Sequence, residues 1–338
     1  MAEKTDSSQR ITRRHRRKIA FLALLVLFPA TVVGFYLYQR FSEESRLREA
    51  ITETDRLDLN WRIVDLETHR KEVPDAENGI LQALEAQRLL PDHLFPWEPQ
   101  EPPDGSGPMA LPRDPPVQPR DDQIRPIRSE LQRARAALAE ARKLVDMTHG
   151  RQHLTWEPDY ARRKWLTVPN LYPGIAQDLR QVANLLGYDI LLQAHDGDLA
   201  QALRSTRALV NTGRCIGDDP VAQTLRMVMQ SLAWTKAERV LAQGEPKPPD
   251  LELAERAFEE EAEEPLLYFA LRGERGILDD VLKDVQAGAI PFKIVRRFLS
   301  ELKRDSRNQF EENLDTFTFI LTVRNERSQL LQFMNRAV

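Results

Sequence analysis

An uncharged run of 20 residues near the N-terminus, from Ile19 to Tyr38, constrains this chain more than any other feature of its sequence. A helix of that length spans about 30 Å, which is the thickness of the hydrocarbon core of a bilayer. Tyr36 and Tyr38 stand at the far end of the run, where aromatic rings favour the membrane interface. Pro29 would kink a soluble helix but is tolerated in a membrane helix. We therefore predict a single transmembrane helix over residues 19–38.

The charges that flank this run predict its orientation. Only Arg40 follows it at once, whereas five bases precede it: Arg13, Arg14, Arg16, Arg17 and Lys18. By the positive-inside rule, residues 1–18 form a basic cytoplasmic tail, and the body lies on the extracytoplasmic side of the cell (inner) membrane. A cleaved signal peptide is the alternative, but it has an apolar region of roughly 7–15 residues followed by small residues. The run here is longer and ends in bulky side chains, which favours an uncleaved signal anchor.

The charge balance of the body bears on its partners. Residues 1–40 carry eight bases and two acids, whereas the remainder carries 40 bases and 50 acids. An acidic body disfavours nucleic acid as a partner, because nucleic-acid binding needs a basic surface that displaces counterions. With 338 residues, of which 41% are hydrophobic, the chain is long enough to bury a core and is not disordered throughout.

Three segments follow the predicted span. Residues 39–90 show apolar side chains at helical intervals with interruptions, which indicates short membrane-proximal helices. Residues 91–126 hold 11 of the 22 prolines and are predicted to be a proline-rich, poorly ordered linker. Residues 127–338 form the predicted helical domain.

Helical periodicity dominates that domain. One apolar seam steps by three and four residues, through Ile127, Leu131, Ala134, Leu138, Ala141 and Val145. The next helices form a predicted hairpin that reverses at Gly197, with an apolar interior made by Leu186, Ile190, Leu199, Leu203 and Val210. A further seam is expected at Val221, Leu225, Val228, Leu232, Lys236 and Val240. Since sustained alternation of period two is lacking, we predict an all-α fold, an irregular bundle or stack of antiparallel hairpins that is distantly tetratricopeptide-like.

Four strings of this sequence carry a resemblance to a known group of proteins. They are LNWRIVDLETHRKEVPDAENG (59–79), HGRQHLTWEPD (149–159), LLQAHDGDLAQALRSTRALVNTGRCIGDDP (191–220) and ALRGERGILDD (270–280). Together they resemble an uncharacterised family of single-pass, membrane-anchored, exported α-helical proteins of planctomycete-type bacteria. The resemblance implies an anchored, exported helical domain, and it supplies no activity, cofactor or catalytic residue.

Two groups of side chains could hold a metal ion, and each has a simpler interpretation. His149 and His153 are four residues apart, as zinc ligands on a helix can be, but Gly150 lies between them and no third ligand is marked. His195, Asp196 and Asp198 could surround a divalent cation, yet Asp and Gly are also the residues that a turn between helices requires. We therefore predict a loop and a turn, with no metal site.

Two groups of acidic side chains are candidates for ion binding or catalysis. Five acids occur in six positions, at Glu259, Glu260, Glu261, Glu263 and Glu264, without the spacing of a calcium loop. Glu274 with Asp279 or Asp280 could act as a glycosidase pair, but the neighbouring Arg272 and Arg275 favour ion pairing on a helix surface. The first cluster is predicted to be a solvated helix end, and neither group is predicted to be catalytic.

The remaining candidates are predicted to be structural. Cys215 is the single cysteine, and we expect it to pack near a helix end. Trp61, Trp156, Trp165 and Trp234 are expected to be core side chains. No residue is assigned a catalytic, cofactor-binding or metal-binding role.

The sequence leaves two functions open. The first is an anchored interaction or scaffold protein of the cell envelope, with an unidentified protein as partner. The second is an envelope hydrolase whose acidic residues converge only in the fold. A cleft with two or more buried carboxylates would favour the hydrolase, and an open groove lined by apolar and Arg side chains would favour the interaction protein.

Overall fold

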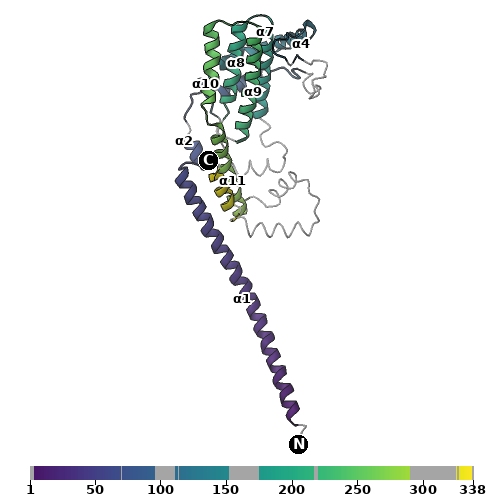
Figure 1. The fold of residues 1–338 in the computed structure, drawn as a ribbon, viewed down its shortest axis with the longest axis vertical. Coiled ribbons are helices and arrows are strands. Elements are labelled where there is room, and N and C mark those ends of the chain that lie inside the picture. The colour runs from purple at the N-terminus through teal and green to yellow at the C-terminus, as the bar shows by residue number, and fades with distance from the viewer. Residues whose placement is uncertain are drawn as a thin grey trace. The chain divides into compact units, whose positions relative to one another are not determined.

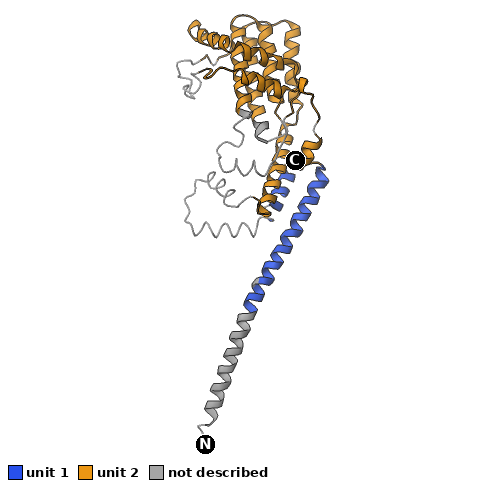
Figure 2. Ribbon diagram, turned by 180° about the vertical axis from the view of Figure 1, so that it is seen from behind, with its two compact units in different colours: residues 1–59, 306–336 blue, residues 60–305, 337–338 orange. Residues whose placement is uncertain are grey.

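The computed structural model describes residues 4–69, 71–95, 111–112, 114–151, 175–216, 220–289, 325 and 327–336, without the side chains of 4–26, 32, 175, 176, 220–222 and 224. Within these ranges the chain is helical and contains no strand, which confirms the all-α prediction. The chain divides into two compact units (Figure 2). Unit 1 comprises residues 1–59 and 306–336, and unit 2 comprises residues 60–305 and 337–338.

Unit 1 is built on one long helix, α1, which runs from Lys4 to Leu57 and includes Pro29. A C-terminal helical segment at 327–336 packs on it, burying a set of mostly apolar side chains from both: Leu47, Ala50, Thr54, Ser328, Leu331 and Met334. The Asn335 side-chain amide donates to the Thr54 hydroxyl at 3.0 Å. The prediction of short helices from residue 39 onward is therefore wrong as far as Leu57, because Thr54 bonds to the backbone of its own helix and does not end it.

The predicted membrane span falls partly on side chains outside the described part of the chain. Residues 19–26 and 32 belong to α1, but only their backbone is described. Among the described residues, no helix combines the length and the apolar character that crossing a membrane requires. The span at residues 19–38 thus stays a prediction.

Unit 2 contains the remaining helices. In chain order they are α2 (Ile63–His69), η1 (Asp75–Glu77), α3 (Gly79–Arg88), α4 (Asp121–Arg133), α5 (Arg135–Arg142), η3 (Lys143–Asp146), α7 (Ile175–His195), α8 (Leu199–Arg214), α9 (Pro220–Gln243), α10 (Pro248–Ala262) and α11 (Leu266–Gln286). Helices α7 to α10 stand side by side in a bundle (Figure 1). Its core is aliphatic and rich in alanine. The small alanine side chains allow neighbouring helices to pack closely.

The reversal between α7 and α8 follows the prediction made from HDGD. Gly197 has φ +81°, the left-handed conformation that glycine adopts without steric cost. Asp198 caps α8, because its carboxylate accepts the backbone N–H of Gln201 at 3.0 Å. The predicted apolar interior is confirmed, with Leu186 and Leu203 among its fully buried members.

The proline-rich segment is shorter and better packed than predicted. Helix α4 begins at Asp121, so the linker boundary at residue 126 is wrong. Pro126 stands within α4, where its neighbour Ile127 is buried and favours the helical conformation through packing. Phe95 is buried at 2% exposure, and its ring lies 4.1 Å from that of Tyr188. Residues 96–110 lie outside the described part of the chain.

Helix α9 follows the predicted seam only in part. Val240 is buried and Leu225 and Leu232 pack against the core, but Val228 is 59% exposed. The face that was not predicted buries Gln223, Arg226, Met229, Ala233, Ala237 and Arg239. Sequence reasoning missed this face because it contains two arginines and a glutamine, whereas the exposed face of α9 carries Met227, Val228 and Trp234.

Candidate binding cavity

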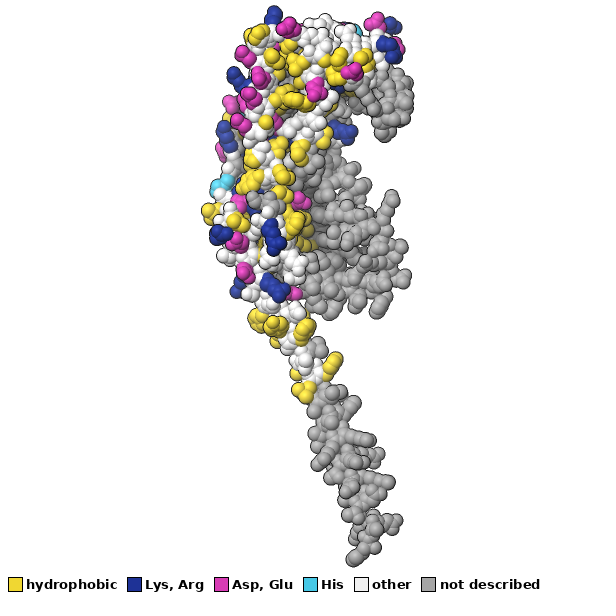
Figure 3. All heavy atoms as spheres, in the orientation of Figure 1, with side chains coloured by type: hydrophobic (Ala, Val, Ile, Leu, Met, Phe, Trp, Pro, Cys, Tyr) yellow, Lys and Arg dark blue, Asp and Glu magenta, His cyan; other side chains and the backbone are white. Residues whose placement is uncertain are grey.

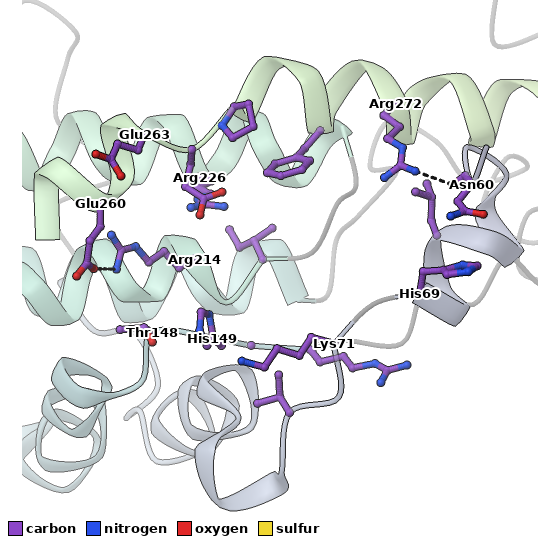
Figure 4. Close-up of a pocket in the computed structure, with 18 residues that line it drawn as sticks. Asn60, His69, Lys71, Thr148, His149, Arg214, Arg226, Glu260, Glu263 and Arg272 are labelled. Carbon is purple, nitrogen blue, oxygen red and sulfur yellow. Dashed lines mark hydrogen bonds and ion pairs between the residues drawn. The ribbon is translucent and has the colours of Figure 1, made fainter. Parts of the chain in front are cut away.

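A cavity of about 960 Å³ opens within unit 2. Its lining comes from the segment around α2, the loop after η3, the C-terminal end of α8, helix α9, and the α10–α11 junction (Figure 4). The lining residues are Asn60, Leu66, His69, Lys71, Val73, Thr148, His149, Gly150, Arg151, Arg214, Ile216, Arg226, Glu260, Glu263, Glu264, Pro265, Phe269 and Arg272. All four strings that carry the family resemblance contribute to this lining.

Backbone contacts fix two of these segments against each other. The Asn78 side chain donates to the Arg151 carbonyl and accepts the Arg151 N–H, both at 3.0 Å. Beside it, the Gly79 N–H donates to the His149 carbonyl at 3.0 Å. The amide group of one side chain thus bonds to both the N–H and the carbonyl of Arg151. These bonds hold the loop of residues 148–151 against the start of α3.

Close approach of backbones explains the glycine in this loop. A Cβ at Gly150 would stand 2.6 Å from the Cα of Cys215, a distance that no packed Cβ tolerates. Cys215 itself is fully buried at the end of α8, and its thiol donates to the Asn211 carbonyl. Burial raises the pKa of this thiol to about 12. The prediction of a cysteine packed at a helix end is confirmed.

Two arginines of the lining, Arg214 and Arg226, bind the buried carboxylate of Glu261. Arg214 donates to Glu261 at 2.7 Å, and Arg226 donates to both of its carboxylate oxygens at 2.6 and 2.8 Å. The side-chain amide of Gln230 donates to the same group. The side chains of both arginines are less than a tenth exposed, so this cluster replaces solvation with charge-assisted hydrogen bonds.

Acidic side chains form the rim at the α10–α11 junction. Glu260 pairs with Arg214 at 2.9 Å. Glu263 and Glu264 are exposed and, within the described part of the chain, have no ion-pair partner. The interpretation of this acidic cluster as a solvated helix end is therefore wrong for Glu261, which is buried, whereas Glu260 is exposed as well as ion-paired.

Basic side chains come from the segments on the other side. Arg151 donates to the Glu67 carboxylate at 3.2 Å, while its Nε is buried and lacks a hydrogen-bond acceptor among the described residues. Arg272 donates to the Asn60 carbonyl at 2.9 Å. Lys71 is exposed on the side of the cavity opposite Glu260 and Glu263 (Figure 4). The exposed acids Glu263 and Glu264 and the exposed base Lys71 therefore lie on different sides of the cavity, whereas Arg214 and Arg226 are ion-paired beside the acids.

Metal-candidate residues of the sequence are not gathered in this cavity. His149 lines it and is exposed, whereas His153 lies outside the described residues. In the HDGD turn, Asp196 receives two hydrogen bonds of 2.7 Å from Arg128. This contact holds the pKa of the Asp196 carboxyl below its usual range, and a weaker contribution comes from His195. The carboxylate is thus occupied by a guanidinium.

The candidate glycosidase pair does not face a common cleft. Glu274 is exposed and Asp279 is buried on the same helix, α11, and five residues of helix rotate a side chain by about 140°. Neither residue, nor Asp280, lines the cavity. Arg275 lies buried with its guanidinium 5.6 Å from the ring of Trp61.

The tryptophans divide between core and surface. Trp61 is buried as predicted, but Trp234 is 56% exposed on α9 and contacts Phe258 edge to face at 5.4 Å. Trp156 and Trp165 lie outside the described residues.

Comparison with known proteins adds no assignment to this geometry. No protein-family model, curated protein or solved structure matches the chain.

Of the four arginines that line the cavity, only Arg272 was considered from the sequence, as an ion-pairing residue. Arg214 and Arg151 stand in strings noted only for resemblance, and Arg226 stands on the face of α9 whose burial was not predicted. The one signal available was the acidic run at α10, because five acids in six positions need basic partners once any of them is buried.

Proposed function

We propose that this chain is a membrane-anchored interaction or scaffold protein, with its helical body on the extracytoplasmic side of the cell (inner) membrane. The anchor is the run at residues 19–38, and the basic residues before it keep the N-terminus in the cytoplasm. The continuity of α1 through this run supports the proposal, because a membrane-crossing backbone must satisfy its own hydrogen bonds.

The cavity of unit 2 is the observation that carries the interaction role. It is open to solvent-exposed side chains and is lined by arginines together with apolar residues such as Leu66, Ile216 and Phe269. A surface of this composition suits recognition of another polypeptide, because Arg and aromatic side chains dominate the binding energy of protein interfaces.

The second candidate function is a hydrolase of the cell envelope that uses converging carboxylates. Such an enzyme needs a carboxyl group whose proton affinity is raised by an apolar site or a second acid. The buried carboxylate near this cavity, Glu261, instead accepts hydrogen bonds from two guanidinium groups, so its oxygens are occupied by protein donors. This arrangement favours the interaction role.

The charge distribution also supports a protein partner over nucleic acid. On the face of the bundle that Figure 3 shows, acidic and basic side chains lie interspersed. Nucleic acid would require a continuous basic surface, and the cavity rim presents Glu260, Glu263 and Glu264.

Site-specific photocrosslinking in native membranes tests the proposal. A photoreactive amino acid replaces Phe269, which lines the cavity, and a matched one replaces Trp234, which is exposed elsewhere on unit 2. We expect one discrete protein adduct from position 269 that is absent from position 234. Equal labelling from both positions, or none from either, would contradict an interaction at the cavity.

Protease accessibility tests the topology. Protease added outside the cytoplasmic membrane should digest the body and leave the N-terminal tail intact. Protection of the body would contradict the proposed orientation.

A further inference from the structure

We propose that the cavity binds a short polypeptide segment that carries charges of both signs. Acidic groups of the segment would lie at the Lys71 end, and basic groups at the end formed by Glu263 and Glu264. This inference rests on the proposed interaction function and adds the chemical class of the bound segment.

The separation of charge within the cavity is the first observation. Figure 4 shows Glu260 and Glu263 beside the ion-paired Arg214 and Arg226, Lys71 on the opposite side of the cavity, and Arg272 farther from the two acids. Within the described residues, neither Lys71 nor Glu263 takes part in an ion pair, so their charges remain available to a ligand. A ligand with a single sign of charge is attracted at one end and repelled at the other, whereas a mixed segment is attracted at both.

The middle of the cavity suits a polypeptide backbone. Glu260 and Glu261 neutralise Arg214 and Arg226, and Ile216 and Phe269 add apolar surface to the lining. At its edge, the buried Nε of Arg151 lacks an acceptor among the described residues. Because a buried unsatisfied donor is costly, an arriving peptide carbonyl or carboxylate that accepts from it gains binding free energy.

The size of the cavity suits a ligand larger than a single amino acid. A volume of about 960 Å³ is at the upper end of the range for ligand sites, which is roughly 300–1,000 Å³. A free amino acid would fill only a small part of it. A nucleic acid or another polyanion would bring negative charge against Glu260, Glu263 and Glu264.

A pool of synthetic hexapeptides with randomised sequence provides a test without a guess about the partner. The full chain, held in detergent micelles on a solid support, is incubated with the pool, and retained peptides are identified by mass spectrometry. We expect peptides with acids in one half and bases in the other to be enriched about fivefold over neutral ones, as for one exposed charge pair.

Charge reversal then redirects the selection. With Lys71→Glu the basic side loses its exposed ammonium group and gains a carboxylate, so the preference for acidic residues in one half of the peptide should be lost while the preference for basic residues in the other half remains. With Glu263→Lys and Glu264→Lys both ends become basic, and acidic peptides should replace the mixed ones. All three residues are exposed, so the fold should persist, and circular dichroism of each variant verifies this. Glu259→Lys is the matched control, because Glu259 belongs to the same acidic run but does not line the cavity.

The outcomes separate this inference from the proposed function. A discrete crosslink from position 269, together with peptide selection that ignores all three reversals, overturns the inference and leaves the interaction role standing. Enrichment of peptides of one sign by the unmodified chain, or of none, overturns it equally. Loss of the crosslink as well would overturn both proposals.

Discussion

Two carboxylates of unit 2, Asp189 and Glu261, are buried, and they differ in the partners that compensate for their lost solvation. Asp189 is fully buried between α7 and α8, and it accepts hydrogen bonds from Ser205 at 2.6 Å and from Gln193 at 3.1 Å. Its charged partner is Arg142, at 2.6 and 2.9 Å, whose side chain is 34% exposed. Glu261 instead binds two arginines that are both nearly buried.

This difference decides what each cluster can contribute. Neutral donors supply half of the bonds to Asp189, and its arginine reaches water, so the cluster fastens helices together at a modest electrostatic cost. The Glu261 cluster confines two nearly buried guanidinium groups beside a cavity, and Arg226 has no other ion-pair partner among the described residues if the carboxylate is lost. The Asp189 cluster links helices of the bundle, whereas the arginines of the Glu261 cluster form part of the cavity lining.

Removal of the Glu261 carboxylate should have the largest effect. Glu261→Ala leaves the buried Arg226 without a counter-charge and leaves Arg214 with only the more exposed Glu260, and we expect the free energy of unfolding to fall by about 4–5 kcal/mol. Urea unfolding of the full chain in mild detergent, followed by circular dichroism, measures this. Glu261→Gln, which keeps the shape and loses the charge, should recover part of the loss. Glu259→Ala, at an exposed position on the same helix, should change stability by less than about 0.5 kcal/mol.

Removal of the Asp189 carboxylate should cost less. Asp189→Ala should lower the free energy of unfolding by about 3 kcal/mol, because Arg142 can turn toward water while Ser205 loses its acceptor. The same urea titration measures it, and crosslinking from position 269 should persist at denaturant concentrations where the variant is folded. A loss equal to that of Glu261→Ala would mean that exposure of the arginine does not explain the difference between the two clusters.

The turn between α7 and α8 offers a way to weaken the Asp189 cluster without touching its carboxylate. Gly197→Val places a β-branched side chain at φ +81° and should cost about 1–3 kcal/mol. Asp198→Ala should cost about 1 kcal/mol through loss of the α8 cap. Thermal unfolding with and without a chelator measures both and tests the turn interpretation. A midpoint that falls with chelator, and no longer does so in His195→Ala, would restore the metal-site hypothesis for this turn.

The exposed pair of Arg128 and Asp196 should show the smallest effect. Arg128 lowers the pKa of Asp196 in the folded state, so the pair stabilises the fold above the unfolded pKa of about 4 and loses this contribution as pH falls. Both side chains are at least one-third exposed, so we expect Arg128→Ala to cost less than about 1 kcal/mol at pH 7. Stability measured from pH 7 to pH 2 should show the variant and the original chain converging below about pH 3. A difference that persists at pH 2 would assign another role to Arg128.

Local signals in the sequence were sufficient where one short segment contains the whole cause. Gly197 and Asp198 specify a reversal because only glycine favours that φ and because a carboxylate at that position caps the next helix. The seam from Ile127 to Ala141 was found for a similar reason, since helical periodicity by itself places those side chains on one face.

Periodicity failed where buried positions are polar. The buried face of α9 contains Arg226 and Arg239, and Arg239 donates to the Val117 carbonyl of the proline-rich segment at 3.0 Å. A hydrophobic pattern cannot predict such a face, because its arginines are buried only when acceptors arrive from segments far away in the chain. The same contact explains why the second half of the predicted linker is packed.

By itself the sequence determined the helical class, the turn at Gly197, and the apolar run with its basic flank from which the membrane anchor is proposed, because each depends on residues within about two dozen positions of one another. Only the tertiary structure decided that Arg151, Arg214 and Glu263 border one cavity and that Glu261 lies buried beneath it. Burial of a charge depends on which distant groups surround it, and its cost is offset only when those groups are in place. For that reason the cavity could not be predicted from any one segment of the sequence, because its lining comes from several segments that are far apart in the chain.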